Sequence, residues 1–496
     1  MIFTLPTCKI NEVRMNRDRF PPCGGNQENM KVLLVVPHYA DRISKVAQTT
    51  IGPPLGLAYL AAVLKRQNID VNILDANALR LTDRETVDRI VQAQPGILGF
   101  SAVTPTVDQC AAIAGAARNV LPDSTIILGG PHATSVPKPT IARFPVFDLL
   151  VRGEADFRFA EIVQTIAANK SVFDHKGVTG KDSDGNIVST DDDEQNIDID
   201  SLPLPARELL PMHRYIGPDG GRMTTMVATR GCPHGCTYCL VPQLFNRRLR
   251  VRRPAGVVDE MEHCHTNYGT KNFNFIDDTF TTKQDWVREL CGEMIDRGIP
   301  KTMRWLCLTR VDMVDRDLLA LMKAAGCYKV EFGIESGDEN VLTSVDKGIN
   351  AQQVKQAFGW AREVGLETLG FVILFFPDET PDSLNATRDL VFATDPDTIQ
   401  VSFCTPFPGT PLEKQLQDRG LSISENWSEF IFLKAPVYQH PRFSHDEMVA
   451  WQQRLLRSFY FRPRVAFRLL RHAIARGGLV GFLRTALAAT RSLLKR

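Results

Sequence analysis

Unbroken apolar runs alternate with stretches of helical periodicity over the first third of the chain. Residues 31–39 (KVLLVVPHY) are one such run, and residues 54–68 follow with apolar side chains three and four positions apart. This alternation repeats up to about residue 170. Continuous apolar strands between amphipathic helices are typical of a parallel sheet that is covered on both faces. The pattern therefore predicts a doubly wound, Rossmann-like α/β domain over residues 31–170.

A second alternating series lies between residues 216 and 440. Amphipathic helices, for example over residues 283–298 and 351–365, separate its apolar strands. The series predicts a partial (β/α)6 barrel, whose functional residues should lie at the C-terminal ends of the strands. The predicted strands span residues 224–230, 272–280, 304–312, 329–337, 369–377 and 398–407.

Three segments flank these two domains. Residues 1–30 lack periodicity, which predicts a disordered leader or a true start at Met30. Residues 171–215 predict a hairpin and a Pro-rich linker. Residues 441–496 are helical and basic, with no acidic residue after Glu447. Such an amphipathic tail either contacts an anionic membrane or covers the barrel with its apolar face.

The composition narrows the class of protein. With 44% hydrophobic and 23% charged residues and a net charge of +1, the chain as a whole is not built to bind nucleic acid. No apolar run approaches the ~20 residues of a membrane helix, and the N-terminus lacks the order of a secretory signal. We therefore expect a cytoplasmic enzyme, in which most of the 11 cysteines are core residues and the others are ligands.

Three cysteines follow the first predicted barrel strand in one short loop. Cys232, Cys236 and Cys239 have the spacing C-x3-C-x2-C, among glycine and proline residues that favour a loop. A structural zinc site needs a fourth ligand, but His234 is too close in the loop and the segment around Cys264 lies on a predicted helix. An iron–sulfur cluster held by three thiolates leaves one iron open to an external ligand.

This motif, with Tyr238 before its last cysteine, resembles that of the radical S-adenosylmethionine (SAM) superfamily. The resemblance implies a [4Fe-4S] cluster on the three cysteines, with SAM bound at the open iron. One electron then cleaves SAM to give a 5′-deoxyadenosyl radical. A one-electron reductase, such as flavodoxin or ferredoxin, is implied as a partner.

Polar residues at later strand ends are similar to SAM-binding positions of the superfamily. The resemblance implies that Arg310 pairs with the SAM carboxylate, although a surface ion pair is an alternative. It implies that Glu335 and Ser336 bond the ribose or amino group of SAM. Asp277 and Asp278 end the second strand, where they either face the barrel mouth or cap the following helix.

The first domain resembles the cobalamin-binding domain that precedes many radical SAM barrels. The resemblance is carried by residues 53–64, 73–77, 99–106, 128–134 and 151–156. The C-terminal strand ends of such a sheet form the ligand crevice. Cobalamin-binding residues are therefore expected among Ser101, Thr104, Gly129, Gly130 and Glu154. The two glycines would let a corrin approach the backbone, or they form an ordinary tight turn.

Two departures from these family patterns stand out. Cobalamin mutases carry D-x-H-x-x-G after the second strand, but residues 75–80 here read DANALR and contain no histidine. Cobalt would then lack a histidine ligand, since we expect neither His38 nor His132 to bind it. In addition, Phe376 and Asp378 stand where small residues are common in the superfamily, at the end of the fifth barrel strand.

Together the resemblances imply a cobalamin-dependent radical SAM methyltransferase that acts on an unactivated carbon through methylcobalamin. Domain order and the basic tail are similar to hopanoid methylases, which implies a polycyclic triterpenoid lipid substrate, methylated at C-3, and peripheral contact with the inner membrane. The alternative is an anaerobic oxidative cyclase of tetrapyrrole biosynthesis acting on Mg-protoporphyrin monomethyl ester. An RNA methylthiotransferase fits less well, because the tail is helical, and a non-catalytic corrin-binding scaffold is a further alternative.

Overall fold

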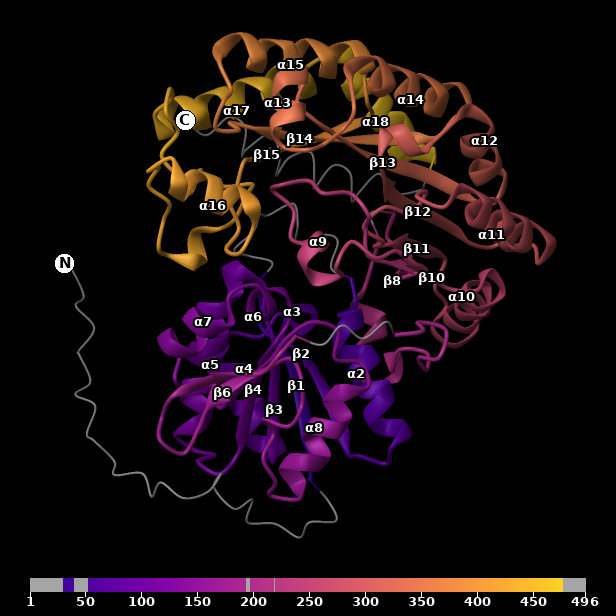
Figure 1. The fold of residues 1–496 in the computed structure, drawn as a ribbon. Coiled ribbons are helices and arrows are strands. Elements are labelled where there is room, and N and C mark those ends of the chain that lie inside the picture. The colour runs from indigo at the N-terminus through magenta and orange to yellow at the C-terminus, as the bar shows by residue number, and fades with distance from the viewer. Residues whose placement is uncertain (1–29, 40–51, 193–196, 218, 476–496) are drawn as a thin grey trace.

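The computed structural model describes residues 30–39, 52–192, 197–217 and 219–475. The predicted leader up to residue 29 and the tail beyond residue 475 lie outside the described residues. Within the described part, one sheet forms the core of the lower domain in Figure 1 and a second sheet forms the core of the upper domain.

The lower domain contains a sheet with the strand order β2-β1-β3-β4-β5, in which all five strands are parallel. Its strands are β1 (Val32–Val36), β2 (Val71–Asp75), β3 (Ile97–Ser101), β4 (Thr125–Gly129) and β5 (Leu149–Val151). Its helices are α2 (Leu55–Arg66), α3 (Ala76–Leu79), α4 (Asp83–Ala93), α5 (Val107–Arg118), α6 (Pro131–Ser135), α7 (Pro137–Arg143) and α8 (Arg158–Ala167).

Strand β1 shows why this sequence forms a doubly wound sheet. Val32 and Leu34 pack with α2 and α8 on one face. Leu33 and Val35 pack with α4 and α5 on the other face. Because both faces are buried, the strand is apolar at every position rather than at alternate positions. The predicted doubly wound α/β fold is confirmed.

The predicted hairpin forms, but it belongs to the first sheet. Strand β6 (Val178–Lys181) pairs antiparallel with β5, and β7 (Ile187–Ser189) pairs antiparallel with β6. The open edge of β5 accepts this extra pairing, so the sheet continues to Ser189. The linker between the two sheets is therefore shorter than the predicted segment 171–215.

The upper domain contains a six-stranded parallel sheet with the order β15-β14-β13-β12-β11-β8. Its strands are β8 (Met223–Met226), β11 (Asn272–Phe275), β12 (Arg304–Thr309), β13 (Cys327–Glu335), β14 (Glu367–Leu374) and β15 (Thr398–Phe403). Its helices include α10 (Pro254–Tyr268), α11 (Gln284–Asp296), α12 (Arg316–Ala324), α13 (Glu339–Ser344), α14 (Ala351–Glu363) and α15 (Pro381–Thr394).

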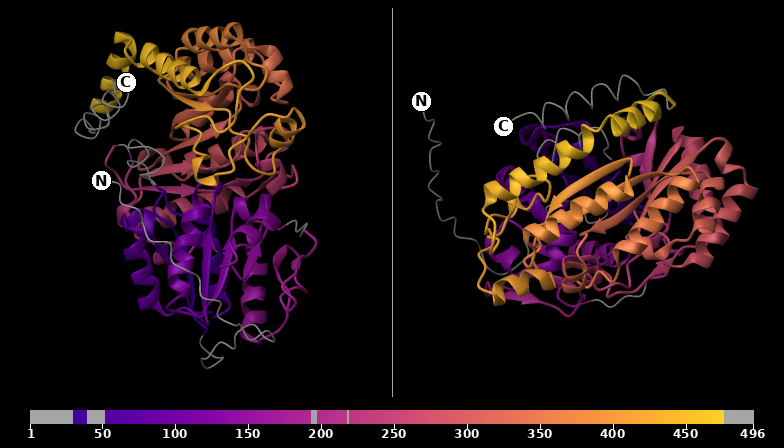
Figure 2. Two further views of the ribbon diagram at one scale, coloured as in Figure 1. Left: turned by 90° about the vertical axis from the view of Figure 1, so that its left-hand side faces the viewer. Right: turned by 90° about the horizontal axis from the view of Figure 1, so that it is seen from above.

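These helices lie on the outer face of the curved sheet, as Figures 1 and 2 show. The core between sheet and helices contains buried rings from neighbouring strands, among them Phe275, Trp305 and Phe332. The predicted (β/α)6 partial barrel is confirmed. The last helices are α16 (Pro411–Asp418), α17 (His445–Tyr460) and α18 (Pro463–Ala475).

Helix α18 is attached to the barrel by an ion-pair cluster. Arg462, Arg464 and Arg468 lie 3.3, 3.2 and 3.0 Å from the carboxylate of Asp395, which follows α15. Arg468 also lies 3.0 Å from Asp397. These contacts fix the start of the basic tail at the N-terminal end of β15.

One face of α18 covers the barrel, while another is exposed. Val465 and Leu469 pack on the barrel core, whereas Phe467, Leu470 and Ile474 are exposed to solvent. No helix of the described residues is long and apolar enough to cross a membrane.

Candidate active site

The three cysteines lie in an excursion from a short hairpin beside β8. Strand β9 (Thr229–Arg230) pairs antiparallel with β10 (Arg250–Val251), and residues 231–249 between them contain the cysteines and helix α9 (Val241–Leu244). Gly231 has φ +89°, and a Cβ at this position would overlap the carbonyl oxygen of Arg248. Only glycine can open this loop.

Two buried carboxylates hold the backbone that leads to Cys232. The Asp277 carboxylate accepts hydrogen bonds from the Ala228 and Thr229 N–H groups. The Asp278 carboxylate accepts one from the Gly231 N–H at 3.1 Å. Burial raises the pKa of Asp277 to about 7 and that of Asp278 to about 6. Neither caps α11, whose N-cap is Lys283.

Cationic side chains lie beside the Cys236 thiol. Arg310 Nη1 is 3.9 Å from its sulfur, while the same guanidinium forms a two-point contact with Asp312 at 2.9 Å. Burial raises the pKa of Cys236, and Lys347 and Arg310 oppose that rise. Burial also raises the pKa of Cys239 to about 12. Positive charge at this place favours the thiolate form that binds iron.

The metal donors of this loop are three cysteine thiols, which do not converge on one point in this structure. In the part of the chain that the structure describes, no group of three or more His, Cys, Asp or Glu side chains is close enough to hold one ion. Burial lowers the pKa of His234, but this residue adds no such group. Three thiols in one loop, with cations beside them, match the ligands of an iron–sulfur cluster with an open iron.

Glu335 is held in an unusual backbone conformation next to this loop. Its φ is +60°, and the pairing of β13 with β14 is irregular between Gly333 and Glu335. Its carboxylate forms a buried ion pair with Lys347 at 2.7 Å. A Cβ on Gly333 would displace the ends of the Glu335 and Lys347 side chains from their present positions. A strained backbone of this kind is common at ligand sites.

Ser336 points away from the cysteine loop. Its hydroxyl lies 3.5 Å from Glu379 and 3.2 Å from Thr387, and it accepts from the Asp338 N–H. The structure therefore places Glu335 and Arg310 beside the thiols. The Ser336 side chain instead points into the barrel wall, towards Glu379 and Thr387.

The end of β14 contains functional candidates that the sequence did not reveal. Phe375 has φ +67°, and its N–H and that of Phe376 donate to the buried Glu379 carboxylate. The Phe376 ring packs on Tyr238, at 5.6 Å between ring centroids. Burial raises the pKa of Glu379 to about 8. The bulky Phe376, noted above as a departure, thus supports the aromatic residue of the cysteine motif.

Two glycines at the end of β4 pack closely against the end of β3. Gly130 has φ +91°, and a Cβ there would meet the Ser101 hydroxyl at 2.7 Å. Gly129 ends β4 beside it. These residues lie at neighbouring strand ends, and the close approach of Gly130 to β3 is what an ordinary tight turn requires, while their contact with a corrin stays a prediction.

The histidines of this domain are engaged elsewhere. His132 is buried, with its ring nitrogens 3.1 Å from Thr104 and 3.2 Å from Thr140. Burial lowers its pKa to about 4. Asn77, in the place of the mutase histidine, accepts from the Tyr39 N–H. Thr104 is thus bound to His132, and the residues at this crevice fit a corrin without a histidine ligand from position 77.

The two domains meet at the cysteine hairpin. Glu154, predicted to contact cobalamin, lies 3.0 Å from Arg230 and 2.6 Å from Arg250. The Tyr215 hydroxyl donates to Asp75 at 2.7 Å across the same interface. The C-terminal strand ends of the first sheet therefore face the cysteine hairpin (Figure 1).

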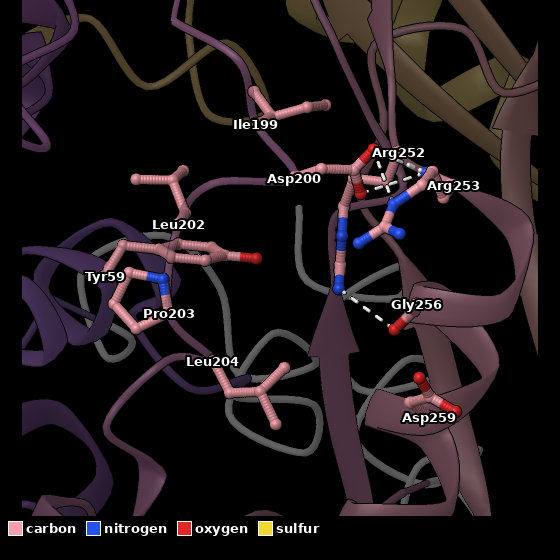
Figure 3. A pocket seen from close by; sticks show the side chains of 10 residues that line it. All are labelled: Tyr59, Ile199, Asp200, Leu202, Pro203, Leu204, Arg252, Arg253, Gly256 and Asp259. Carbon is pink, nitrogen blue, oxygen red and sulfur yellow. Dashed lines mark hydrogen bonds and ion pairs between the residues drawn. The ribbon is translucent and has the colours of Figure 1, made fainter.

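A separate cavity of about 220 Å³ lies where the linker crosses from one domain to the other. Figure 3 shows Tyr59 of α2 extending its hydroxyl towards Arg252, with Asp200 and Arg253 at the rim. Arg252 and Arg207 both pair with the fully buried Glu260 behind it. Arg207, Arg252 and Glu260 form a buried ion-pair cluster, which lies apart from the cysteine loop.

Comparison with known proteins agrees with this arrangement. The family model described as the Radical SAM superfamily matches residues 226–391, and the B12 binding domain matches residues 45–163. An uncharacterized methyltransferase of Pyrococcus horikoshii is 32% identical over 439 residues, which is 88% of this chain and 94% of that protein.

More distant relatives differ in activity. An anaerobic magnesium-protoporphyrin IX monomethyl ester cyclase of Cereibacter sphaeroides is 29% identical over 87% of this chain and 71% of its own length. A hopanoid C-3 methylase of Methylococcus capsulatus is 24% identical over 81% of this chain and 76% of its own length. The solved structure of TsrM, a radical SAM methyltransferase of Kitasatospora setae, shares the fold, with TM-score 0.72, 17% identity and coverage of 93% of this chain and 100% of that chain.

The matched domains account for the predicted cofactors, which are a [4Fe-4S] cluster and SAM for the barrel and cobalamin for the first domain. The cysteine loop, the two matched family models and the relative that matches along most of its length lead to one conclusion. The chain belongs to the radical SAM superfamily, in the group whose barrel follows a B12-binding domain.

Proposed function

We propose that this chain is a cobalamin-dependent radical SAM methyltransferase that methylates an unactivated carbon of a polycyclic triterpenoid lipid. The observation that carries the proposal is the joining of the cysteine loop and the cobalamin crevice at one interface, through Glu154, Arg230 and Arg250. The cluster with SAM supplies hydrogen abstraction, and methylcobalamin supplies the methyl group.

The residues of the chain bind and orient these groups. Cys232, Cys236 and Cys239 hold the cluster, and Arg310 and Glu335 bind the charged end of SAM beside Cys236. Because Arg310 also contacts Asp312, its guanidinium is fixed before SAM arrives, so less entropy is lost on binding.

On the cobalamin side, Ser101, Gly129 and Gly130 form the floor of the crevice. Tyr238 and Phe376 close the apolar side of the cysteine loop and exclude water from the reacting atoms.

The lipid substrate is favoured by the tail and by one relative. The exposed apolar side chains of α18 lie on the same helix as the exposed Arg464 and Arg471. Such a helix is suited to an anionic bilayer surface, from which a hopanoid could enter the barrel. The hopanoid C-3 methylase relative supports C-3 as the carbon attacked.

A second candidate function is the anaerobic oxidative cyclase, because a relative with this name matches 87% of the chain. A cyclase oxidises its substrate and adds no carbon. Parallel incubations of anaerobically reconstituted protein and SAM bearing a CD3 group, one with a hopanoid extract and one with Mg-protoporphyrin monomethyl ester, separate the two. A product heavier by one CD3-for-hydrogen replacement supports the methyltransferase, and an unlabelled oxidised tetrapyrrole supports the cyclase.

The electron donor is expected to be a small acidic reductase such as flavodoxin or ferredoxin. Arg247 and Arg248 are exposed on the turn that packs against Gly231 and Gly235 of the cysteine loop. Their charge would attract an acidic partner to the surface above the cluster. Replacing Arg248 with Glu should weaken flavodoxin-driven SAM cleavage, while cleavage driven by dithionite should stay unchanged.

A further inference from the structure

Arg230, the last residue of β9 before the cysteine loop, pairs with two carboxylates of the first domain. It stands two positions before Cys232, and its side chain is 12% exposed. Its guanidinium lies 2.7 and 3.0 Å from the two oxygens of Asp156, and 3.0 Å from Glu154. It also packs over the Tyr59 ring at 5.0 Å.

Arg250 completes this contact from the other strand of the hairpin. It is the register partner of Arg230 in the β9–β10 pair, and it lies 2.6 Å from the second oxygen of Glu154. Like charges directly opposite each other on antiparallel strands repel. Glu154 lies between the two arginines and compensates that repulsion, so the hairpin that carries the cysteines is favoured only when the first domain is docked.

The two carboxylates belong to the loop after β5, at the crevice of the first domain. Asp156 is 6% exposed, and both of its carboxylate oxygens accept hydrogen bonds from Arg230. Both carboxylate oxygens of Glu154 likewise form ion pairs, one with Arg230 and one with Arg250. Their contacts run to the second domain, and the predicted contact of Glu154 with cobalamin stays a prediction.

We infer that Arg230, Arg250, Glu154 and Asp156 form a positioning clamp that sets the distance between the cysteine loop and the cobalamin crevice. The clamp joins both ends of the loop, through Arg230 and Arg250, directly to the neighbouring domain. This inference rests on the proposed function for its catalytic consequence. Its structural part, the coupling of loop 231–249 to the docked domain, stands independently.

Two variants weaken the clamp without removing a cluster ligand. Arg230→Lys keeps the charge but loses the two-point contact with Asp156. Glu154→Gln keeps the volume but removes the charge between the arginines. Arg222→Lys is the matched control, because Arg222 lies at the opposite end of β8 and donates to the Tyr268 carbonyl.

Hydrogen exchange in the cofactor-free protein tests the structural part. Both clamp variants should exchange faster over residues 231–249, with unchanged exchange in the core strands of each domain, whereas the control should match the wild type. Unchanged exchange of the loop would overturn the inference. Global unfolding would overturn it as well, because each domain has its own core and the clamp supports only their contact.

The reconstituted protein tests the consequence. The magnetic coupling between the reduced cluster and cob(II)alamin, measured by electron paramagnetic resonance, should weaken in both variants, although SAM is still cleaved. Methyl groups transferred per SAM cleaved should fall about 10- to 100-fold, as expected for a shift of about 1 Å between reacting groups. Unaltered coupling and transfer in a variant whose loop exchanges faster would contradict a positioning role. A wild type that cleaves no SAM would instead refute the proposed function and leave the exchange result standing.

Discussion

Cys236 differs from the other two thiols of its loop because the Arg310 guanidinium lies 3.9 Å from its sulfur. We expect Cys236→Ala to abolish SAM cleavage while cobalamin binding is retained, since the crevice is built by another domain. Production of 5′-deoxyadenosine and the visible spectrum of bound cobalamin measure the two effects. Cys291→Ala is the control, because Cys291 is a core residue of α11. Cleavage that survives in Cys236→Ala contradicts the ligand assignment.

Gly231 opens the same loop with a backbone conformation that other residues rarely adopt. We expect Gly231→Ala to lower the iron content of the reconstituted protein and its stability by roughly 1–3 kcal/mol, because of the positive φ and the overlap with Arg248. Gly292→Ala, where an added Cβ meets nothing within 4 Å, should be neutral or stabilising. Equal iron content in the two variants would show that the loop tolerates the change.

Glu379 is buried under the strained end of β14, facing Asp338, Cys404 and Tyr438. Burial raises its pKa to about 8 from the ordinary 4.5, so between these values the folded state holds one proton more than the unfolded state. The free energy of unfolding therefore falls as pH rises, by up to about 1.4 kcal/mol per pH unit.

Glu379→Gln removes this proton uptake. Relative to the wild type, the variant should gain stability as pH rises from about 5 to about 8. Denaturant unfolding of both proteins at these two pH values measures the difference. A difference in free energy of unfolding between the two proteins that is the same at both pH values would mean that Glu379 does not hold its proton in the folded state.

The residues of the site differ in how far the sequence reveals them. The cysteines are recognisable because a fixed spacing within eight residues is enough to define their chemistry. Glu379 and Lys347 are not, because each acquires its role only when a separate strand end is brought beside it. Glu154 was placed correctly at a strand end, but its partners come from 76 residues away in the chain, at Arg230.

Among the elements, hydrophobic periodicity predicted both parallel sheets and their helices. The strands of the first sheet are buried on both faces and leave an unbroken apolar signal, whereas the barrel strand β14 is buried only at alternate positions. It did not predict that the hairpin β6–β7 would join the first sheet, because pairing at an open sheet edge depends on backbone groups and not on side chains. It also left open which face of the tail contacts the barrel.

Asp395 decides how α18 is attached. Its side chain is 8% exposed and faces three arginines. We expect Asp395→Asn to lower the free energy of unfolding by about 2 kcal/mol and to release α18 to proteolysis, because charged hydrogen bonds are lost. Asp389→Asn should change neither, because Asp389 is 65% exposed and pairs only with its neighbour Arg388. Protection of α18 in both variants would contradict this attachment.

In the whole molecule, two separately folded cores are joined by the linker, by the buried ion-pair cluster around Glu260 and by the Arg230 clamp. The sequence predicted the two domains and their order, yet it contained no signal for their contact. That contact depends on arginines and carboxylates whose partners lie in the other domain, and spacing along the chain does not identify such pairs.

The central claim is that a cluster on the three-cysteine loop splits SAM beside the cobalamin crevice. Mass-spectrometric detection of 5′-deoxyadenosine, after one-electron reduction of oxygen-free protein loaded with iron, sulfide and cobalamin, tests it most directly. The account predicts that this nucleoside accumulates with the wild type and is absent when any one of Cys232, Cys236 or Cys239 is replaced by alanine. Its absence from the wild type with a full complement of iron, or its persistence in an alanine variant, would contradict the account.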